Sequence, residues 1–375
     1  MGALVREVGA LVAVVALLAI PAVVNVPVFP QMVSVSMMVI YAGSERATRR
    51  EQKRKEMGAE AEPREVISGS AAYRFPLAAS LMLGGLFIAF KYLPQEWISP
   101  LLTFGSVFMG VLAMCGVLAA LADSIEPRLM KQVGFSDTYS CSVSDILSFI
   151  LCLPVGWAYV RYRHFLANNI MACSLALAAI EFLGIEDYKT GAILLAGLFV
   201  YDIFWVFGST KLFGSNVMVT VAKGFEGPIK LLFRRSAGEF SMLGLGDVVL
   251  PGLFIALIWR FDERSGPCAS LDPRKKPYFT TVMIGYFLAV VATYAALVLF
   301  DAAQPALLYI VPGILFSTLA LAVARGEVGE LIAYSEAETT KSDAHECGGS
   351  EKKAGDAIAD QVVDSARTNE KEKAQ

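Results

Sequence analysis

Two aspartates, Asp202 and Asp247, each lie inside a long apolar stretch of the sequence, residues 198–208 and 243–252. A carboxylate in a membrane-spanning helix costs roughly 2.5–3.5 kcal/mol on insertion scales, so two of them suggest a functional use. If the two meet, they can share one proton. The ionised carboxylate then takes a proton from water while the neutral one donates to a peptide carbonyl. Alternatively, each aspartate caps a helix or faces a polar seam between helices.

The composition is typical of a membrane protein. Of the 375 residues, 55% are hydrophobic and 18% are charged, and the apolar runs are too long for the helices of a soluble core. The six cysteines form no CxxC pattern, and His164 and His345 both fall outside the apolar stretches. We therefore expect no metal, no cofactor and no His-based catalytic triad. Nucleic-acid binding is not expected either, because no basic groove is interleaved with aromatic residues.

Hydropathy predicts an all-α polytopic membrane protein with about nine transmembrane helices. The first apolar run, 9–43, is interrupted by prolines, and we interpret it as one uncleaved, broken span. The alternative is a signal-like segment at 9–22 followed by a span at 26–43. The charged segment 44–65 is expected to be an aqueous loop. The other predicted spans are residues 75–93, 100–122, 143–160, 167–184, 190–208, 242–260, 278–299 and 305–324.

The spans and the tail define the expected domains. A membrane domain is predicted over residues 1–330, with its catalytic part at about 190–325. Residues 331–375, rich in Glu, Lys, Ala, Ser and Asp, are expected to form a disordered tail.

The distribution of basic residues predicts the orientation. It favours a lumenal N-terminus and a cytosolic C-terminus, although five basic residues between 211 and 235 oppose this assignment. The chain ends with Lys371 and Lys373 at the fifth and third positions from the end, a spacing that resembles a dilysine retrieval signal of the endoplasmic reticulum.

The two acidic spans are consecutive and therefore antiparallel. Asp202 lies about six residues before its span ends, and Asp247 about five residues after its span begins. At roughly 1.5 Å per residue, both lie some 8–10 Å from the same membrane face, which is the equal depth that a pair requires. Gly244 and Gly246 allow a neighbouring helix to come close, or allow the helix to start late and admit water.

A third polar feature opens the last span, at Gln304, Pro305, Ala306 and Leu307. Proline at a helix start is ordinary. In a functional interpretation, Pro305 delays the start of the helix beside the acidic pair and leaves backbone groups free to hold an extended substrate. The β-branched run 217–222 predicts a strand that pairs with an unwound substrate, with an interfacial helix or a packed loop as alternatives.

Taken together, Tyr201-Asp202, Gly244-Leu245-Gly246-Asp247 and Gln304-Pro305-Ala306-Leu307 resemble the YD, GxGD and PAL motifs of the signal peptide peptidase family, the intramembrane aspartic proteases related to presenilin. The similarity is concentrated over roughly 190–335.

The resemblance implies a presenilin-like arrangement of nine spans. It also implies that Asp202 and Asp247 are catalytic and that the other motif residues shape the active site. The expected activity is cleavage of signal-peptide remnants and other transmembrane segments within the bilayer of the endoplasmic reticulum, by homo-oligomers that need no cofactor.

Two other functions fit an acidic pair in a membrane. A carrier or channel could use Asp202, Asp247 and Glu181 as a proton or cation path, although no internal repeat relates the two halves of the chain. A chaperone-like binder of membrane segments would need neither aspartate.

Overall fold

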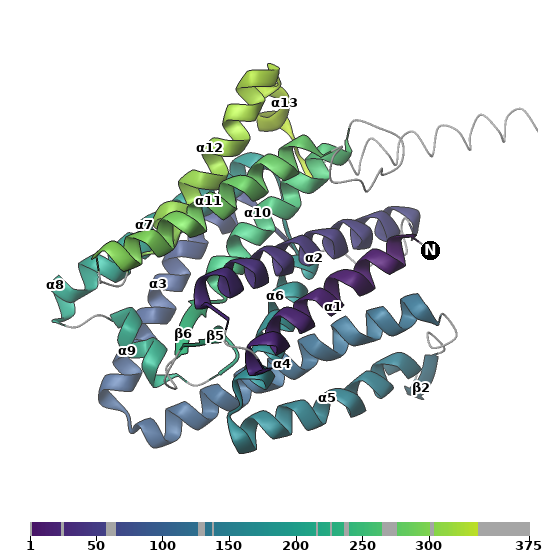
Figure 1. Ribbon diagram of the computed structural model, residues 1–375, viewed down its shortest axis with the longest axis vertical. Coiled ribbons are helices and arrows are strands. Elements are labelled where there is room, and N and C mark those ends of the chain that lie inside the picture. The colour runs from purple at the N-terminus through teal and green to yellow at the C-terminus, as the bar shows by residue number, and fades with distance from the viewer. Residues whose placement is uncertain are drawn as a thin grey trace, which may run out of the picture.

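The computed structural model describes residues 2–23, 26–57, 65–126, 132–136, 139–214, 217–225, 227–235, 240–264, 276–300 and 304–336. Within them, the chain forms a bundle of helices (Figure 1). The ten helices of 16 residues or more are α1 (Gly2–Val23), α2 (Val28–Met57), α3 (Gly69–Tyr92), α4 (Gln95–Ile125), α5 (Val143–Tyr162), α6 (Phe165–Phe182), α7 (Tyr188–Ile203), α10 (Gly246–Glu263), α11 (Pro277–Phe300) and α12 (Leu307–Arg325).

Shorter elements connect these helices. They are the π-helical turn η3 (Phe204–Gly208) and the helices α8 (Ser209–Phe213), α9 (Val217–Gly224) and α13 (Val328–Ala333). Three two-stranded ribbons complete the described structure. They pair β1 (Glu65–Ile67) in parallel with β4 (Leu183–Ile185), and, antiparallel, β2 (Gln132–Ser136) with β3 (Tyr139–Ser142) and β5 (Lys230–Arg234) with β6 (Phe240–Gly244).

The predicted all-α membrane architecture is confirmed. Eight predicted spans each coincide with a described helix, namely α3, α4, α5, α6, α7 with η3, α10, α11 and α12. Seven described helices, these eight without α10, are long and apolar enough to cross a bilayer. Helix α10 carries Asp247 in its first turn and Arg260, Asp262 and Glu263 near its end. The count of nine crossings stays a prediction.

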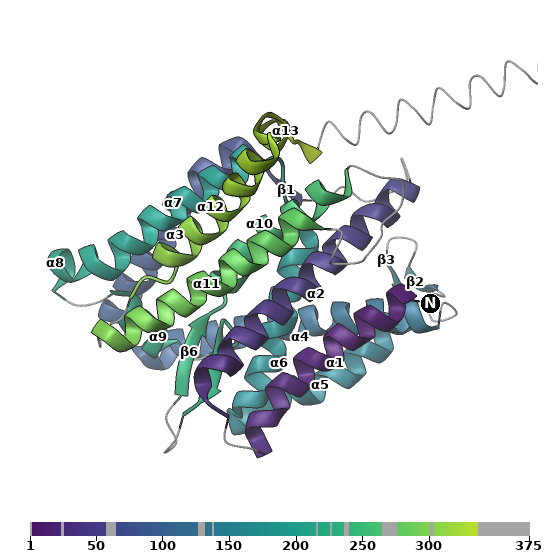
Figure 2. The ribbon, with the colours of Figure 1, turned by 45° about the horizontal axis from the view of Figure 1, so that its top comes forward.

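The first apolar run differs from the predicted single span. It forms two helices, α1 and α2, which lie side by side in Figures 1 and 2 and run in opposite directions. The single span over 9–43 is therefore wrong, and the alternative division into two apolar segments matches the structure. The loop expected from residue 44 is wrong as far as Met57, because α2 continues through it; residues 58–64 lie outside the described residues.

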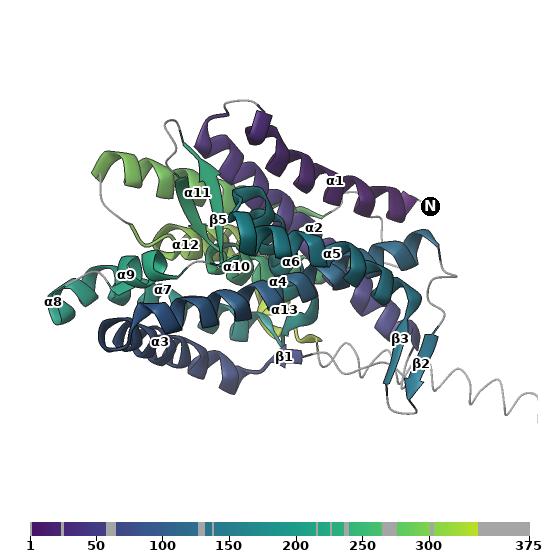
Figure 3. The ribbon, with the colours of Figure 1, turned by 90° about the horizontal axis from the view of Figure 1, so that it is seen from below.

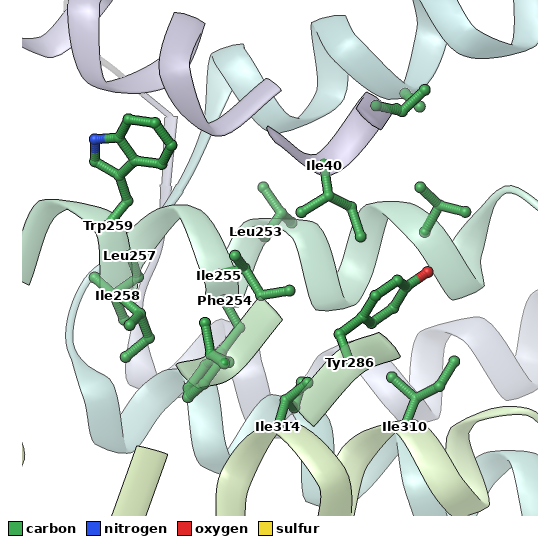
Figure 4. Packing of buried hydrophobic residues seen from close by; sticks show 14 of the residues in the cluster. Ile40, Leu253, Phe254, Ile255, Leu257, Ile258, Trp259, Tyr286, Ile310 and Ile314 are labelled. Carbon is green, nitrogen blue, oxygen red and sulfur yellow. The ribbon is translucent and has the colours of Figure 1, made fainter. Parts of the chain in front are cut away.

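Helix α10 is the centre of the bundle. Every residue from Pro251 to Phe261 is buried, as expected for a helix that is apolar around its whole circumference. Ile40 of α2, Tyr286 of α11 and Ile310 of α12 pack around it in one continuous core (Figure 4).

Helices α11 and α12 approach each other at two glycines. A Cβ atom on Gly285 would lie 2.5 Å from Ser317 Oγ and 2.6 Å from the carbonyl oxygen of Gly313, so only a residue without a side chain fits at this crossing. Small residues permit this close packing in membrane helices, and here they hold α12 against the bundle.

The segment after α13 is tied to the start of α7. The backbone N–H of Glu336 donates to the carbonyl of Glu186, and Tyr188 N–H donates to the carbonyl of Tyr334. The predicted domain boundary at 330 falls within α13, and the described structure continues to Glu336. The rest of the tail, with Lys371 and Lys373, lies outside the described residues, and its disorder stays a prediction.

A buried ion-pair cluster joins α1, α2 and α6. The Arg46 guanidinium, 4% exposed, bonds Glu7 at 2.6 Å and Glu181 at 2.7 Å. Arg49 also contacts Glu7, at 2.8 Å. Because Glu7 opens α1 and Arg46 lies in the second half of α2, the cluster fixes the antiparallel pairing of these helices.

We predict that Arg46→Ala lowers the free energy of unfolding by about 3 kcal/mol, because it removes the buried partner that Glu7 and Glu181 share and leaves them only the more exposed Arg49 and Arg50. Arg54→Ala is the control: Arg54 is 29% exposed and pairs with Glu51 within one helix, so its loss costs about 1 kcal/mol or less. Denaturant unfolding in one detergent gives both values. Equal losses in the two variants would show that the cluster does not hold α1 in place.

Candidate active site

Asp202 lies near the end of α7, where the helix changes its winding. Its side chain is buried, and the π-helical turn η3 begins two residues later. Such turns inside helices are frequent at functional sites, and their wider winding redirects the side chains around them. Trp205 within this turn is anchored to α3, since its indole N–H donates to the Ser80 hydroxyl at 3.2 Å.

Asp247 lies in the first turn of α10 and remains partly exposed. The helix does not begin near residue 242, as the predicted span did, because residues 240–244 form strand β6. Asp247 is therefore not several residues inside a helix. The hypothesis that the glycines let the helix start late fits this geometry, while the depth argument built on two full spans does not.

Gly244 is required for space beside Asp247. A Cβ atom on Gly244 would lie 3.2 Å from Asp247 Oδ2, which is tighter than an ordinary contact. A Cβ atom on Gly246 would meet only Leu250 Cδ1, at 3.8 Å. Of the two glycines in this motif, the first is the one whose missing side chain leaves room for the carboxylate.

The two carboxylates lie within electrostatic range of each other, and both lie within electrostatic range of the Tyr201 hydroxyl. The Tyr201 side chain is half-buried, and its ring lies 6.4 Å from that of Trp205. The structure thus brings together the residues of the first two predicted motifs.

The third motif reaches the same place through its backbone. The Leu307 N–H donates a buried hydrogen bond to Asp202 Oδ2 at 2.9 Å. Helix α12 begins at Leu307, directly after Pro305 and Ala306, so this N–H has no carbonyl one turn earlier in its own helix to bond. Pro305 is buried, whereas Gln304 and Ala306 are partly exposed. The motif was predicted to offer free backbone groups to a substrate. In the structure one such group, the Leu307 N–H, bonds the side chain of Asp202.

The loop before Asp247 differs from the predicted strand at 217–222. Residues 217–224 form helix α9, in which Val217 and Val221 pack against Phe90 and Trp205. The β-branched residues favoured a strand, but their spacing of four also suits one face of a helix, and tertiary packing selects the helix. The ribbon near Asp247 is instead β5–β6, the element that leads into α10.

Neither Asn168 nor Asn169 is among the residues predicted from the sequence, yet both contact this ribbon. They could have been found as two adjacent side-chain amides inside an apolar span, because burying amides without hydrogen-bond partners is costly. Glu181, the third acid of the carrier hypothesis, lies in the last turn of α6 and pairs with Arg46. Among the described residues, no three His, Cys, Asp or Glu side chains gather where they could hold a metal ion.

Comparisons with known proteins agree with the motifs. The family model described as signal peptide peptidase matches residues 59–338. Signal peptide peptidase of Mus musculus is 38% identical over 293 residues, covering 72% of this chain and 74% of that protein, and the Homo sapiens protein gives the same values. A solved structure of a presenilin family intramembrane aspartate protease covers 77% of this chain and 97% of its own, with 11% sequence identity and a TM-score of 0.48.

We predict that Asp202→Ala increases the hydrogen-exchange rate of the Leu307 amide roughly tenfold or more, because a bond to a charged acceptor is lost. Asp202→Asn retains a side-chain oxygen and should preserve most of the protection. The amide of Leu331, which bonds Glu327, serves as an internal reference in the same experiment. Equal exchange of Leu307 in the two variants would show that Asp202 does not hold this amide.

Proposed function

Because the chain belongs to the signal peptide peptidase family, we propose that Asp202 and Asp247 are its catalytic pair. The protein is a multi-pass membrane protein and an intramembrane aspartic endopeptidase. The observation that carries the assignment of the pair is the buried bond from Leu307 to Asp202, whose carboxylate lies within electrostatic range of Asp247. Three motifs that lie far apart in the sequence converge there on two carboxylates.

In the proposed reaction, water bound between the carboxylates is the nucleophile. The ionised aspartate accepts a proton from this water as its oxygen attacks the peptide carbonyl carbon, while the protonated aspartate donates to the carbonyl oxygen. The tetrahedral intermediate collapses when the C–N bond breaks: the leaving nitrogen takes the proton that the first aspartate accepted from water, and the second aspartate regains its proton from a hydroxyl group of the intermediate as the new carboxyl group forms. The Leu307 N–H orients the Asp202 carboxylate, and the amino-terminal end of α12 stabilises the single negative charge of the pair.

The proposed substrates are signal-peptide remnants and other membrane-embedded peptide segments. A helical substrate must unwind before a carboxylate pair can reach its backbone, because the carbonyls of a helix are engaged in internal bonds. Strand β6 pairs with β5 alone among the described residues and ends three residues before Asp247. We place the unwound substrate along its other edge, where main-chain bonds align it for cleavage.

The proposed location is the membrane of the endoplasmic reticulum, with the C-terminus in the cytosol and Lys371 and Lys373 as its retrieval signal. The predicted lumenal N-terminus assumed a single first span. Helices α1 and α2 are antiparallel. If both cross the membrane, the amino end of α1 lies on the same membrane side as the half of α2 that contains Arg46. Association of several copies also stays a prediction.

The carrier alternative is less well supported. Glu181 is neutralised by Arg46 and Arg50 at the end of α6, and Asp202 lies fourteen residues into α7, roughly 20 Å along the helix from its start. The three acids therefore do not line one path.

We predict that Asp202→Asn and Asp247→Asn each reduce peptide cleavage by a factor of about 10² to 10⁴, because the pair loses its general acid or base. The assay uses the detergent-solubilised protein and a tagged signal peptide. Asp145→Asn is the control, since this exposed carboxylate caps the start of α5. Cleavage at the parent rate by either variant of the pair would overturn the assignment.

A second prediction separates the two glycines. Gly244→Ala should lower kcat by about tenfold, because the added methyl group displaces the Asp247 carboxylate by a few tenths of an ångström. Gly246→Ala should lower it less, since its Cβ makes only an ordinary contact. Initial rates at saturating substrate measure both. A larger loss at Gly246 would mean that the crowding beside Asp247 does not control the rate.

A further inference from the structure

Asn168 and Asn169 are two adjacent amides buried in an apolar helix. They are 1% and 0% exposed, and they lie in the first turn of α6. Burying an amide is costly unless most of its donors and acceptors are paired, so the two residues imply specific partners; of their side-chain polar atoms, only Asn168 Oδ1 has none. Those partners are backbone groups of β5, the first strand of the ribbon that precedes Asp247. Strand β5 lies beside α6 in Figure 3.

The contacts of Asn169 resemble those of a neighbouring strand. Its Oδ1 accepts from the Leu232 N–H at 2.8 Å, and its Nδ2 donates to the Leu232 carbonyl at 2.7 Å. Asn168 Nδ2 donates to the Lys230 carbonyl at 2.7 Å and to Asn169 Oδ1 at 3.2 Å. Two side-chain amides thus engage the backbone groups that a third strand would engage.

The alternation of an antiparallel ribbon determines which edge remains open. Because the backbone groups of Leu232 face α6, those of Leu231 and Phe233 face β6, where they lie opposite Leu243 and Ser241. On β6, the groups of Met242 and Gly244 then point away from β5. Within the described residues, the ribbon has one edge capped by asparagines and one edge available to a substrate strand.

The ribbon leads directly into the helix that carries Asp247, because β6 ends at Gly244 and α10 begins at Gly246. The Leu245 N–H donates to the Ile229 carbonyl at 3.1 Å, which closes the ribbon at the point where α10 begins. A shift of β5 along α6 would therefore move β6, Gly244 and the approach to Asp247 together. Asn169 is the residue whose two bonds oppose such a shift.

We propose that Asn169, supported by Asn168, is a positioning residue that sets which peptide bond is cleaved. It caps the outer edge of β5 and holds the ribbon in one register on α6, so the open edge of β6 presents a substrate strand to Asp202 and Asp247 at one depth. This inference rests on the proposed peptidase function and adds a determinant of cleavage position to it.

The test measures cleavage position as well as rate. The full-length parent, Asn169→Leu and Met171→Ala are given one tagged signal peptide in detergent, and the products are identified by mass spectrometry. Met171 is the matched control: it is buried in the same helix but faces Val107 and Val111 of α4, so its variant weakens α6 without touching the ribbon. Thermal unfolding is recorded for each protein.

The expected result is one main product for the parent and for Met171→Ala. For Asn169→Leu we expect a second product displaced by two residues, because a strand that slips by two keeps the same side chains on each face. Its kcat should fall by about tenfold to a hundredfold through misplacement of the scissile bond. A purely structural role would lower the unfolding temperature and leave the product unchanged, as in the control.

Two outcomes overturn the inference. One is a single product at the parent position with the parent kcat/KM in Asn169→Leu. The second outcome applies if Asn169→Leu does not fold. Asn168→Ala removes the bonds to the Lys230 carbonyl and to Asn169 Oδ1 and leaves both bonds between Asn169 and Leu232. A displaced product in this variant supports the inference, and an unchanged product and rate contradict it. Absence of cleavage by the parent would instead overturn the proposed function, and this inference with it.

Discussion

The hydrogen bond from the Leu307 N–H to Asp202 is the contact on which the arrangement depends. It joins α7 to α12 across 105 residues of sequence, and it lies in a setting where an unpaired carboxylate would be costly. The bond forms because Pro305 stops the helix from starting earlier, which leaves the first amide of α12 free to donate. A motif that contributes no catalytic side chain thus determines how one of the two acids is held.

The rest of the bundle fixes the positions of the two ends of that contact. Helix α10 is buried on all sides and carries Asp247 into the site from a rigid base. The close approach at Gly285 and Gly313 holds α12 against α11, and the anchor between Trp205 and Ser80 holds the π-helical turn after Asp202. Buried polar groups also join elements of this core: the asparagines of α6 bond β5, and the cluster around Arg46 joins α1, α2 and α6.

Much of this structure could be predicted from the sequence because the bilayer imposes a strong length signal. Eight helices follow apolar runs, and the three motifs were expected to meet. The errors arise where hydropathy carries no information about pairing. The run at 9–43 belongs to two antiparallel helices, α1 and α2. Arg46 lies in a charged segment whose composition predicts a loop, but it is buried and paired with Glu7 and Glu181.

Other features depend on contacts that no local pattern reveals. The strand expected at 217–222 is a helix because its valines pack on a distant aromatic cluster. Residues 242–244 were predicted to open an apolar span, but they form part of strand β6 because they pair with β5. The sequence predicts that backbone groups near Pro305 are free to bond, but it does not predict that the Leu307 N–H bonds Asp202. The relative placement of α7 and α12 is determined by packing, which no local pattern encodes.

The most direct test of the account is an experimental structure with a hydroxyl-bearing transition-state mimic bound. The account predicts that the hydroxyl lies within hydrogen-bonding distance of both the Asp202 and Asp247 carboxylates, while the Leu307 N–H still donates to Asp202. A mimic whose hydroxyl contacts only one of these carboxylates, with the other turned away, would contradict it.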